Sequence, residues 1–225
     1  MTVSRAAIEK NLTEVRERMR AAARKAGRNP EEIELVAVTK TVGIEETLAL
    51  YDFGVRDFGE NRLQPAREKI ERFPHEATWH MIGNVQRRKC PEIMRLFDKV
   101  DAVDRVAVAE TFNKRCEESG REVPLPILVE VNVSDETSKH GFSPQELPEA
   151  LDKIREMKYL RVDGLMTMAP FVENPEETRP FFARLRHLAE FHELPTLSMG
   201  MTNDFEVALE EGATQVRIGT ALFKT

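Results

Sequence analysis

Lys40 is the residue of this sequence whose position first suggests chemistry. It follows the apolar, β-favouring run IELVAVT (33–39), where a strand is expected to end. Lysine is a poor choice for the buried end of a strand, because an ammonium group is costly to desolvate. Two interpretations are open. Lys40 could be the first solvated residue after the strand, or a desolvated lysine whose amine forms a Schiff base.

Two segments near the C-terminus carry small hydroxyl residues and glycines in a pattern that could bind an anion. LSMGMTND places Ser198 and Thr202 at the end of one expected strand, and VRIGTALF places Gly219 and Thr220 at the end of the next. Small residues let backbone N–H groups approach an anion, and the dipole of a following helix favours it. Taken singly, the segments are also explained by helix capping at Thr202 and a turn at Gly219.

Asn61 and His80 lie near the ends of two further expected strands. The amide of Asn61, in FGENRLQ, could donate a hydrogen bond to a ligand oxygen or cap the following helix. His80, in TWHMIG, is more typical of a packed core histidine than of a base. Metal catalysis has little support, because no paired motif such as HExxH occurs and the five histidines are scattered.

A polar loop, EVNVSDETSKHGF, follows the fifth expected strand. It supplies Asn132, Ser138, Lys139 and Gly141. These residues could cover a ligand, although a surface turn is the simpler interpretation for most of them.

Short apolar runs alternate with amphipathic, helix-like stretches along the whole chain. The expected strands are 33–39, 55–59, 78–83, 99–104, 126–133, 161–166, 196–201 and 215–220. Eight strands separated by seven helices predict a (β/α)8 TIM barrel, with an extra N-terminal helix before the first strand. A doubly wound open sheet is the alternative, but no GxGxxG follows the first strand and eight strands are many for 225 residues. We expect one domain over residues 1–225.

Barrel geometry places Lys40 at the functional end of the fold. Active sites of these barrels lie at the carboxyl ends of the strands, where Lys40 is expected, whereas Lys99 begins its strand and belongs to the opposite face. In many barrels the loops after the last two strands bind phosphate. A lysine and a phosphate site at the same end predict pyridoxal 5′-phosphate (PLP) as the cofactor.

Arg217 is informative for this prediction. It precedes Gly219 by two residues, so both residues should lie on the same face of the strand, either toward the barrel interior or toward its exterior. An arginine facing the pyridine nitrogen would keep that nitrogen unprotonated, because arginine does not release its own proton at neutral pH. A structural ion pair at the rim is the alternative.

Net charge, mean hydropathy and cysteine content argue against several other classes of protein. The net charge is -6, the isoelectric point is near 5.6 and the mean hydropathy is -0.44, which argue against a general nucleic-acid binder. Cys90 and Cys116 show no CxxC spacing, so free thiols in a reducing compartment are expected. Neither a signal peptide nor a membrane span is expected, and we predict a cytoplasmic monomer.

Seven segments together resemble a known family, and they occur in the family's order over nearly the whole chain. They are LVAVTKT, FGENRLQ, WHMIGNVQ, VNVSDETSKHGF, GLMTMAP, LSMGMTND and VRIGTALF. The chain resembles the PLP homeostasis proteins, which are PLP-binding barrels similar to the N-terminal domain of alanine racemase.

The resemblance implies a set of cofactor-binding residues. Lys40 would carry PLP as a Schiff base, Asn61 would lie beside the cofactor and Arg217 near the pyridine nitrogen. The phosphate would lie at Ser198, Thr202, Gly219 and Thr220, and Met201 would line the same pocket. Two positions depart from the family: Thr202 is more often serine there, and His140 replaces a residue that is usually small.

The resemblance also implies a function. The family is regarded as binding PLP without an established reaction and is linked to control of PLP supply, with apo-PLP enzymes as expected acceptors. The alternative is a small PLP-dependent amino-acid racemase. Racemisation requires proton donors on both faces of the carbanion, and Lys40 is the only evident base in the sequence.

Overall fold

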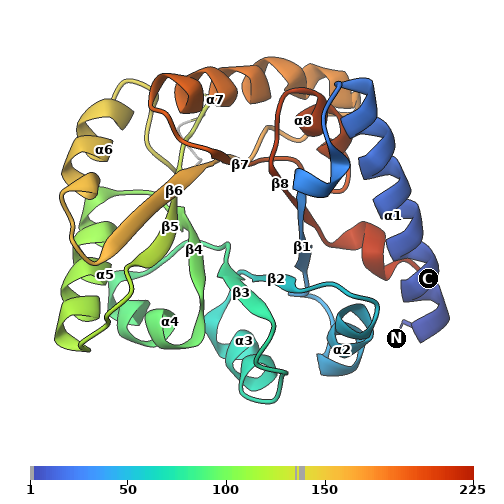
Figure 1. The fold of residues 1–225 in the computed structure, drawn as a ribbon, viewed down its shortest axis with the longest axis horizontal. Coiled ribbons are helices and arrows are strands. Elements are labelled where there is room, and N and C mark those ends of the chain that lie inside the picture. Colours follow the sequence, from blue (N-terminus) through green and yellow to red (C-terminus); the bar gives the residue numbers. More distant parts are fainter. Residues whose placement is uncertain (1–2, 135, 137–139) are drawn as a thin grey trace.

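The computed structural model describes residues 3–134, 136 and 140–225. Ser138 and Lys139 of the polar loop lie outside the described residues. Eight parallel strands close into one barrel in chain order, with helices around the outside (Figure 1). The predicted (β/α)8 barrel is confirmed, and the doubly wound alternative is wrong because β8 pairs with β1, for example Val216 with Leu35.

The eight strands fall within or close to the predicted segments. They are β1 (Glu34–Val38), β2 (Asp57–Glu60), β3 (Thr78–Met81), β4 (Lys99–Val103), β5 (Leu125–Glu130), β6 (Leu160–Met166), β7 (Thr196–Ser198) and β8 (Gln215–Ile218). Most of them end earlier than predicted. The residues that follow turn away from the sheet and form the loops at the carboxyl end of the barrel.

Among the described residues, one helix precedes the barrel and seven others alternate with its strands. They are α1 (Arg5–Lys25), α2 (Ile44–Asp52), α3 (Leu63–Ile70), α4 (Cys90–Leu96), α5 (Val106–Glu118), α6 (Leu147–Arg155), α7 (Arg179–Phe191) and α8 (Phe205–Glu210). Short 3-10 helices span Pro30–Glu32, Arg87–Lys89, Pro175–Thr178 and Thr220–Phe223.

Helix α1 docks on the outside of the barrel through one apolar face, as its spacing predicts. Ser4 caps the helix by accepting a hydrogen bond from the Ala7 N–H, and Arg18 pairs with Glu206 of α8 at 2.7 Å. The buried residues of the helix are Ile8, Leu12, Val15, Met19, Ala22 and Ala23. The helix runs beside α8 and the C-terminal 3-10 helix, so it supports the part of the barrel that carries the predicted anion-binding segments (Figure 1).

Alternate residues of β8 face the barrel interior at successive depths. Gln215 lines a small cavity near the amino ends of the strands, whereas Arg217 and Gly219 line a large pocket at the carboxyl ends. The prediction that Arg217 shares the direction of Gly219 is confirmed. The two ends of the barrel interior therefore carry separate groups of polar side chains.

The two cysteines are free and buried, as the composition predicts. Burial raises the pKa of the Cys90 thiol to about 11 and shifts the pKa of Cys116 in the same direction. Both thiols are therefore poor nucleophiles and poor metal ligands at neutral pH. Among the described helices, none is both long and apolar enough to cross a membrane.

Candidate cofactor site

A pocket of about 580 Å³ lies at the carboxyl ends of the strands. Seven of the eight sequence-predicted site residues line it. They are Lys40, Asn61, Met201, Thr202, Arg217, Gly219 and Thr220. Ser198 is the exception, because its side chain is fully buried beneath the pocket. The volume is in the range of small-molecule and cofactor sites.

Lys40 lines the pocket and follows the end of β1, which is fixed by buried hydrogen bonds. The preceding residue, Thr39, is fully buried, and its Oγ1 donates to Glu60 Oε1 at 2.6 Å. The Thr39 carbonyl accepts a hydrogen bond from Lys69 Nζ at 2.6 Å, and Lys69 also pairs with Glu60 at 2.7 Å. Lys40 itself is exposed. The strand end is thus fixed while the amine remains accessible from the pocket.

The sequence analysis missed Lys69, which holds this segment from α3. The buried residues of α3 are Leu63, Ala66 and Lys69, spaced three apart on one face. A lysine within an apolar helical stripe was the signal that could have identified it, since such a lysine must find a buried partner.

Asn61 lies where the loops after β2 and β3 come into close contact. A Cβ atom added to Gly83 would lie 2.4 Å from the Asn61 carbonyl oxygen, so only glycine allows this approach. Helix α3 begins at Leu63 with Arg62 at the N-cap position. The interpretation of Asn61 as a helix cap is therefore wrong, and its side chain is left at the pocket.

The loops after β7 and β8 form a cradle of backbone donors. The Ala221 N–H donates to Thr202 Oγ1 at 3.3 Å, and Asp204 takes the N-cap position of α8, so Thr202 does not cap that helix. Four pocket residues have backbone N–H groups that donate to no other described residue: Thr202, Asn203, Gly219 and Thr220. Backbone N–H groups without a protein acceptor, gathered in one pocket, are suited to bind an anion.

Gly219 brings the strand backbone up to this cradle. A Cβ atom at this position would lie 3.3 Å from both the Cβ and the carbonyl oxygen of Val38, which is tighter than ordinary packing. A larger residue would therefore push β8 away from β1 or fill the space where an anion could bind.

Arg217 lies at the floor of the pocket and is held by uncharged partners. Its guanidinium donates to Ser198 Oγ at 2.6 Å and to the Thr167 carbonyl at 2.8 Å. No carboxylate of the described residues lies within ion-pair distance, so the interpretation of Arg217 as a rim ion pair is wrong. Burial lowers the pKa of Arg217, yet an arginine remains charged in proteins. The structure places Ser198 under Arg217, where it orients the guanidinium.

Glu130, at the end of β5, is a pocket residue that the sequence analysis missed. Its side chain is 4% exposed, and its carboxyl group has no hydrogen-bond partner among the described residues. Burial raises the pKa of Glu130 to about 7; Asp104 acts in the same direction, and Arg217 opposes it. An acidic residue inside the apolar run PILVEVNV was the available signal.

Replacing Glu130 by glutamine is expected to change how stability depends on pH. The folded-state pKa of about 7 lies above the ordinary value of 4.5, so the folded chain binds an extra proton between these pH values. Wild-type stability should therefore fall as pH rises from about 4.5 to 7, by at most about 3 kcal/mol from this group. The E130Q variant lacks this loss and should be the more stable protein at pH 8, as measured by urea unfolding.

The exposed residue Glu122, in the loop before β5, provides a matched control. E122Q should unfold with the same pH dependence as wild type. Parallel stability curves for wild type and E130Q between pH 4 and 8 would show that Glu130 titrates normally.

Comparison with known proteins identifies the family of this chain. The family model described as "Alanine racemase, N-terminal domain" matches residues 3–225. A "Pyridoxal phosphate homeostasis protein" of Aquifex aeolicus is 39% identical over 219 residues, covering 94% of this chain and 95% of the relative. A protein of the same name from Pseudomonas aeruginosa is 40% identical, covering 96% and 94%. The chain belongs to the pyridoxal phosphate homeostasis protein family.

One of the solved structures similar to this chain contains PLP. PipY of Synechococcus elongatus, solved with PLP bound, superimposes with a TM-score of 0.82 at 30% identity, covering 96% of this chain and all of that one. The likeness to this PLP-bound structure therefore extends over almost the whole barrel.

Proposed function

We propose that this protein binds PLP through a Schiff base at Lys40 and acts in PLP homeostasis. The observation that carries the proposal is one pocket with a lysine amine on one wall and a cradle of free N–H groups on another. Arg217 lies in the floor of the same pocket. The names of the relatives and the PLP-bound PipY structure support the same cofactor.

The residues present fit the chemical groups of PLP. The N–H groups of Thr202, Asn203, Gly219 and Thr220 would hold the phosphate, and Asn61 would donate to a ring substituent. Arg217 uses two of its five N–H groups on Ser198 and Thr167, which leaves others available for the pyridine nitrogen. When bound, PLP supplies an electrophilic carbon and a ring that can accept electrons.

Arg217 favours holding the cofactor over catalysis. A guanidinium can donate a hydrogen bond to the ring nitrogen but does not transfer its proton, so the ring would remain a weak electron sink. An acidic partner at the same place would strengthen the sink. We therefore propose a carrier that keeps PLP and passes it to apo-PLP enzymes, and that works as a cytoplasmic monomer. Two free thiols fit a reducing compartment.

Spectroscopy with added PLP tests the cofactor assignment. The chain should develop an absorption band near ~420 nm that borohydride abolishes, with the reduced cofactor's mass on the peptide containing Lys40. Absence of the band at saturating PLP would refute the proposal. Mixing the loaded chain with an apo-PLP enzyme then tests transfer, because a carrier should restore enzyme activity. Light scattering of the same preparation should give the mass of one chain.

A further inference from the structure

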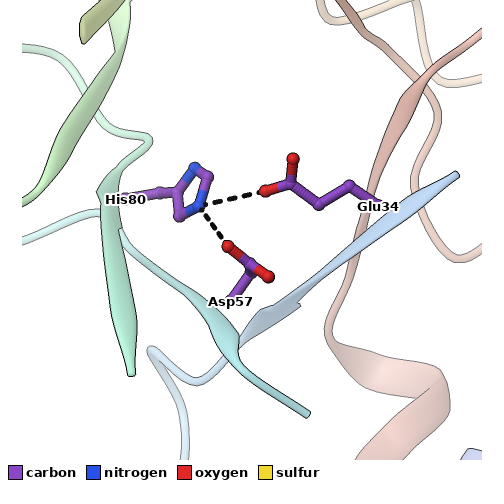
Figure 2. Close-up of side chains that lie close together, drawn as sticks. All are labelled: Glu34, Asp57 and His80. Atoms are coloured by element: carbon purple, nitrogen blue, oxygen red, sulfur yellow. Dashed lines mark hydrogen bonds and ion pairs between the residues drawn. The ribbon is translucent and has the colours of Figure 1, made fainter. Parts of the chain in front are cut away.

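A second polar cluster lies at the opposite end of the barrel from Lys40. Glu34 and Asp57 are the first residues of β1 and β2, and His80 reaches toward them from β3 (Figure 2). His80 Nε2 lies 3.3 Å from Glu34 Oε1 and 3.2 Å from Asp57 Oδ1, and the three ligand atoms all lie within 4.8 Å of one another. In a tetrahedral site with bonds of about 2.0–2.1 Å, neighbouring ligand atoms are about 3.3 Å apart.

The imidazole of His80 is oriented as metal-binding histidines usually are. Its Nδ1 lies 2.9 Å from Asp101 Oδ2, and Gln215 Nε2 holds the same oxygen at 2.7 Å. A carboxylate at Nδ1 fixes the ring and directs Nε2 toward the ligand position, and such partners raise the metal affinity of a histidine. His80 is fully buried, whereas Glu34 and Asp57 are partly exposed, so an ion could enter from solvent.

The charge of the cluster and the space beside it favour the binding of a further cation. Three carboxylates, from Glu34, Asp57 and Asp101, face two cations. One is the Lys99 ammonium, whose Nζ lies 3.2 Å from Glu34 Oε1, and the other is the His80 ring, which has a carboxylate oxygen at each nitrogen. Asp101 is 1% exposed, and its Oδ1 has no hydrogen-bond partner among the described residues. Glu34, Lys99, Asp101 and Gln215 help to line a cavity of about 40 Å³, enough for a water molecule as a further ligand.

We propose that Glu34, Asp57 and His80 bind one divalent transition-metal ion of the Zn²⁺ type. On binding, the ion would take the place of the proton between His80 Nε2 and the two carboxylates, and that proton would leave to solvent. This exchange adds one positive charge to a cluster with an excess of carboxylates. One imidazole nitrogen with two carboxylate oxygens suits Zn²⁺ and its neighbours in the first transition row better than Ca²⁺ or Mg²⁺.

The proposed role of this ion is structural and independent of PLP. Its ligands join the first residues of β1 and β2 to His80 of β3, and Asp101 extends the cluster to β4. In barrels of this type the amino end serves stability, whereas the carboxyl end serves function. The ion should therefore raise the thermal unfolding midpoint without changing the PLP spectrum.

Calorimetric titration of the chelator-treated chain with ZnCl₂ tests the proposal. We expect saturable binding of one ion per chain, with or without PLP, and a higher unfolding midpoint. E34Q and D57N should each weaken binding by about tenfold or more. K99Q should strengthen binding, because Lys99 competes for the Glu34 carboxylate. Ligand and competitor variants thus have opposite expected effects.

D163N is the matched control for charge. Asp163 lines the same small cavity but is bonded to Arg161, so this variant removes one carboxylate charge without removing a proposed ligand. Its Zn²⁺ affinity should stay within about twofold of wild type. The partly exposed positions of Glu34 and Asp57 make E34Q and D57N safer tests of binding than a change at buried His80.

Two outcomes would overturn the proposal. The first is no saturable Zn²⁺ binding by the wild-type chain. The second is equal binding by E34Q, D57N and D163N, which would place the ion elsewhere. In either case the cluster is only a network of hydrogen bonds and charges. The PLP proposal does not depend on this result, since the two sites lie at opposite ends of the barrel.

Discussion

Replacing Lys40 by alanine is expected to abolish covalent attachment of PLP. The variant has no amine in the pocket wall, so neither the band near ~420 nm nor the borohydride-stable mass should form. The phosphate cradle at Thr202, Gly219 and Thr220 remains, so weak non-covalent binding should persist. We expect the apparent PLP affinity to fall at least ~100-fold, or about 2.8 kcal/mol, in an equilibrium titration.

Lys114 supplies the control for this experiment. It lies on the surface of α5, where its Nζ is 3.8 Å from Glu118, and K114A should bind PLP as wild type does. An undiminished band in K40A would show that another lysine carries the cofactor. Competition by inorganic phosphate for the remaining weak binding of K40A would support the position of the cradle.

Replacing Lys69 by methionine is expected to cause the largest loss of stability. Lys69 is 7% exposed, and it pairs with fully buried Glu60 while also holding the Thr39 carbonyl. Glu60 Oε2 already has no partner among the described residues, so removal of the ammonium leaves a buried carboxylate with Thr39 Oγ1 alone. Breaking such a pair costs about 3–5 kcal/mol, measurable by urea unfolding.

Two further variants distinguish a broken pair from a general packing defect. Replacement of both partners, K69M/E60L, should recover much of the lost stability, because a buried ion pair and an apolar pair are often equivalent. K153M breaks the exposed pair of Lys153 with Glu149, which is 2.6 Å long, and should change stability little. If K69M unfolds like K153M, the buried pair contributes nothing to the fold.

The same pair should affect cofactor binding through the strand end. In K69M/E60L the barrel is expected to be stable, but the Thr39 carbonyl no longer has its ammonium donor. Lys40 would then be less firmly positioned, and PLP should bind more weakly than to wild type. Unchanged PLP affinity in the stable double variant would show that Lys69 acts on stability alone.

The sequence alone was sufficient to predict the barrel and the end of it that carries the pocket. Each strand has an apolar run of its own, and each helix has a periodic apolar face, so local patterns identify them without knowledge of their neighbours. Because parallel strands in a barrel share one direction, the position of Lys40 after the first strand decides its end of the barrel. The two anion-binding segments, Asn61 and Arg217 were identified from their positions near the expected strand ends, and the resemblance added Met201 and a role for each residue.

Strand ends and side-chain partners were decided by the tertiary structure. The seventh strand was predicted over 196–201, but β7 ends at Ser198 because the next residues turn into the pocket loop. Ser198 was expected at the phosphate, and its depth beneath Arg217 depends on how β7 lies beside β8. Nothing in the local sequence specifies that pairing.

The largest departures from expectation concern residues that meet between successive strands. His80 is buried, as predicted for a core histidine, yet it contacts acids that begin two other strands. Glu34, Asp57 and His80 are separated by more than twenty residues each, so no compact motif in the chain could reveal them. Local pattern determined which elements form; closure of the barrel determined which side chains face one another, because its register brings distant strand ends to the same depth.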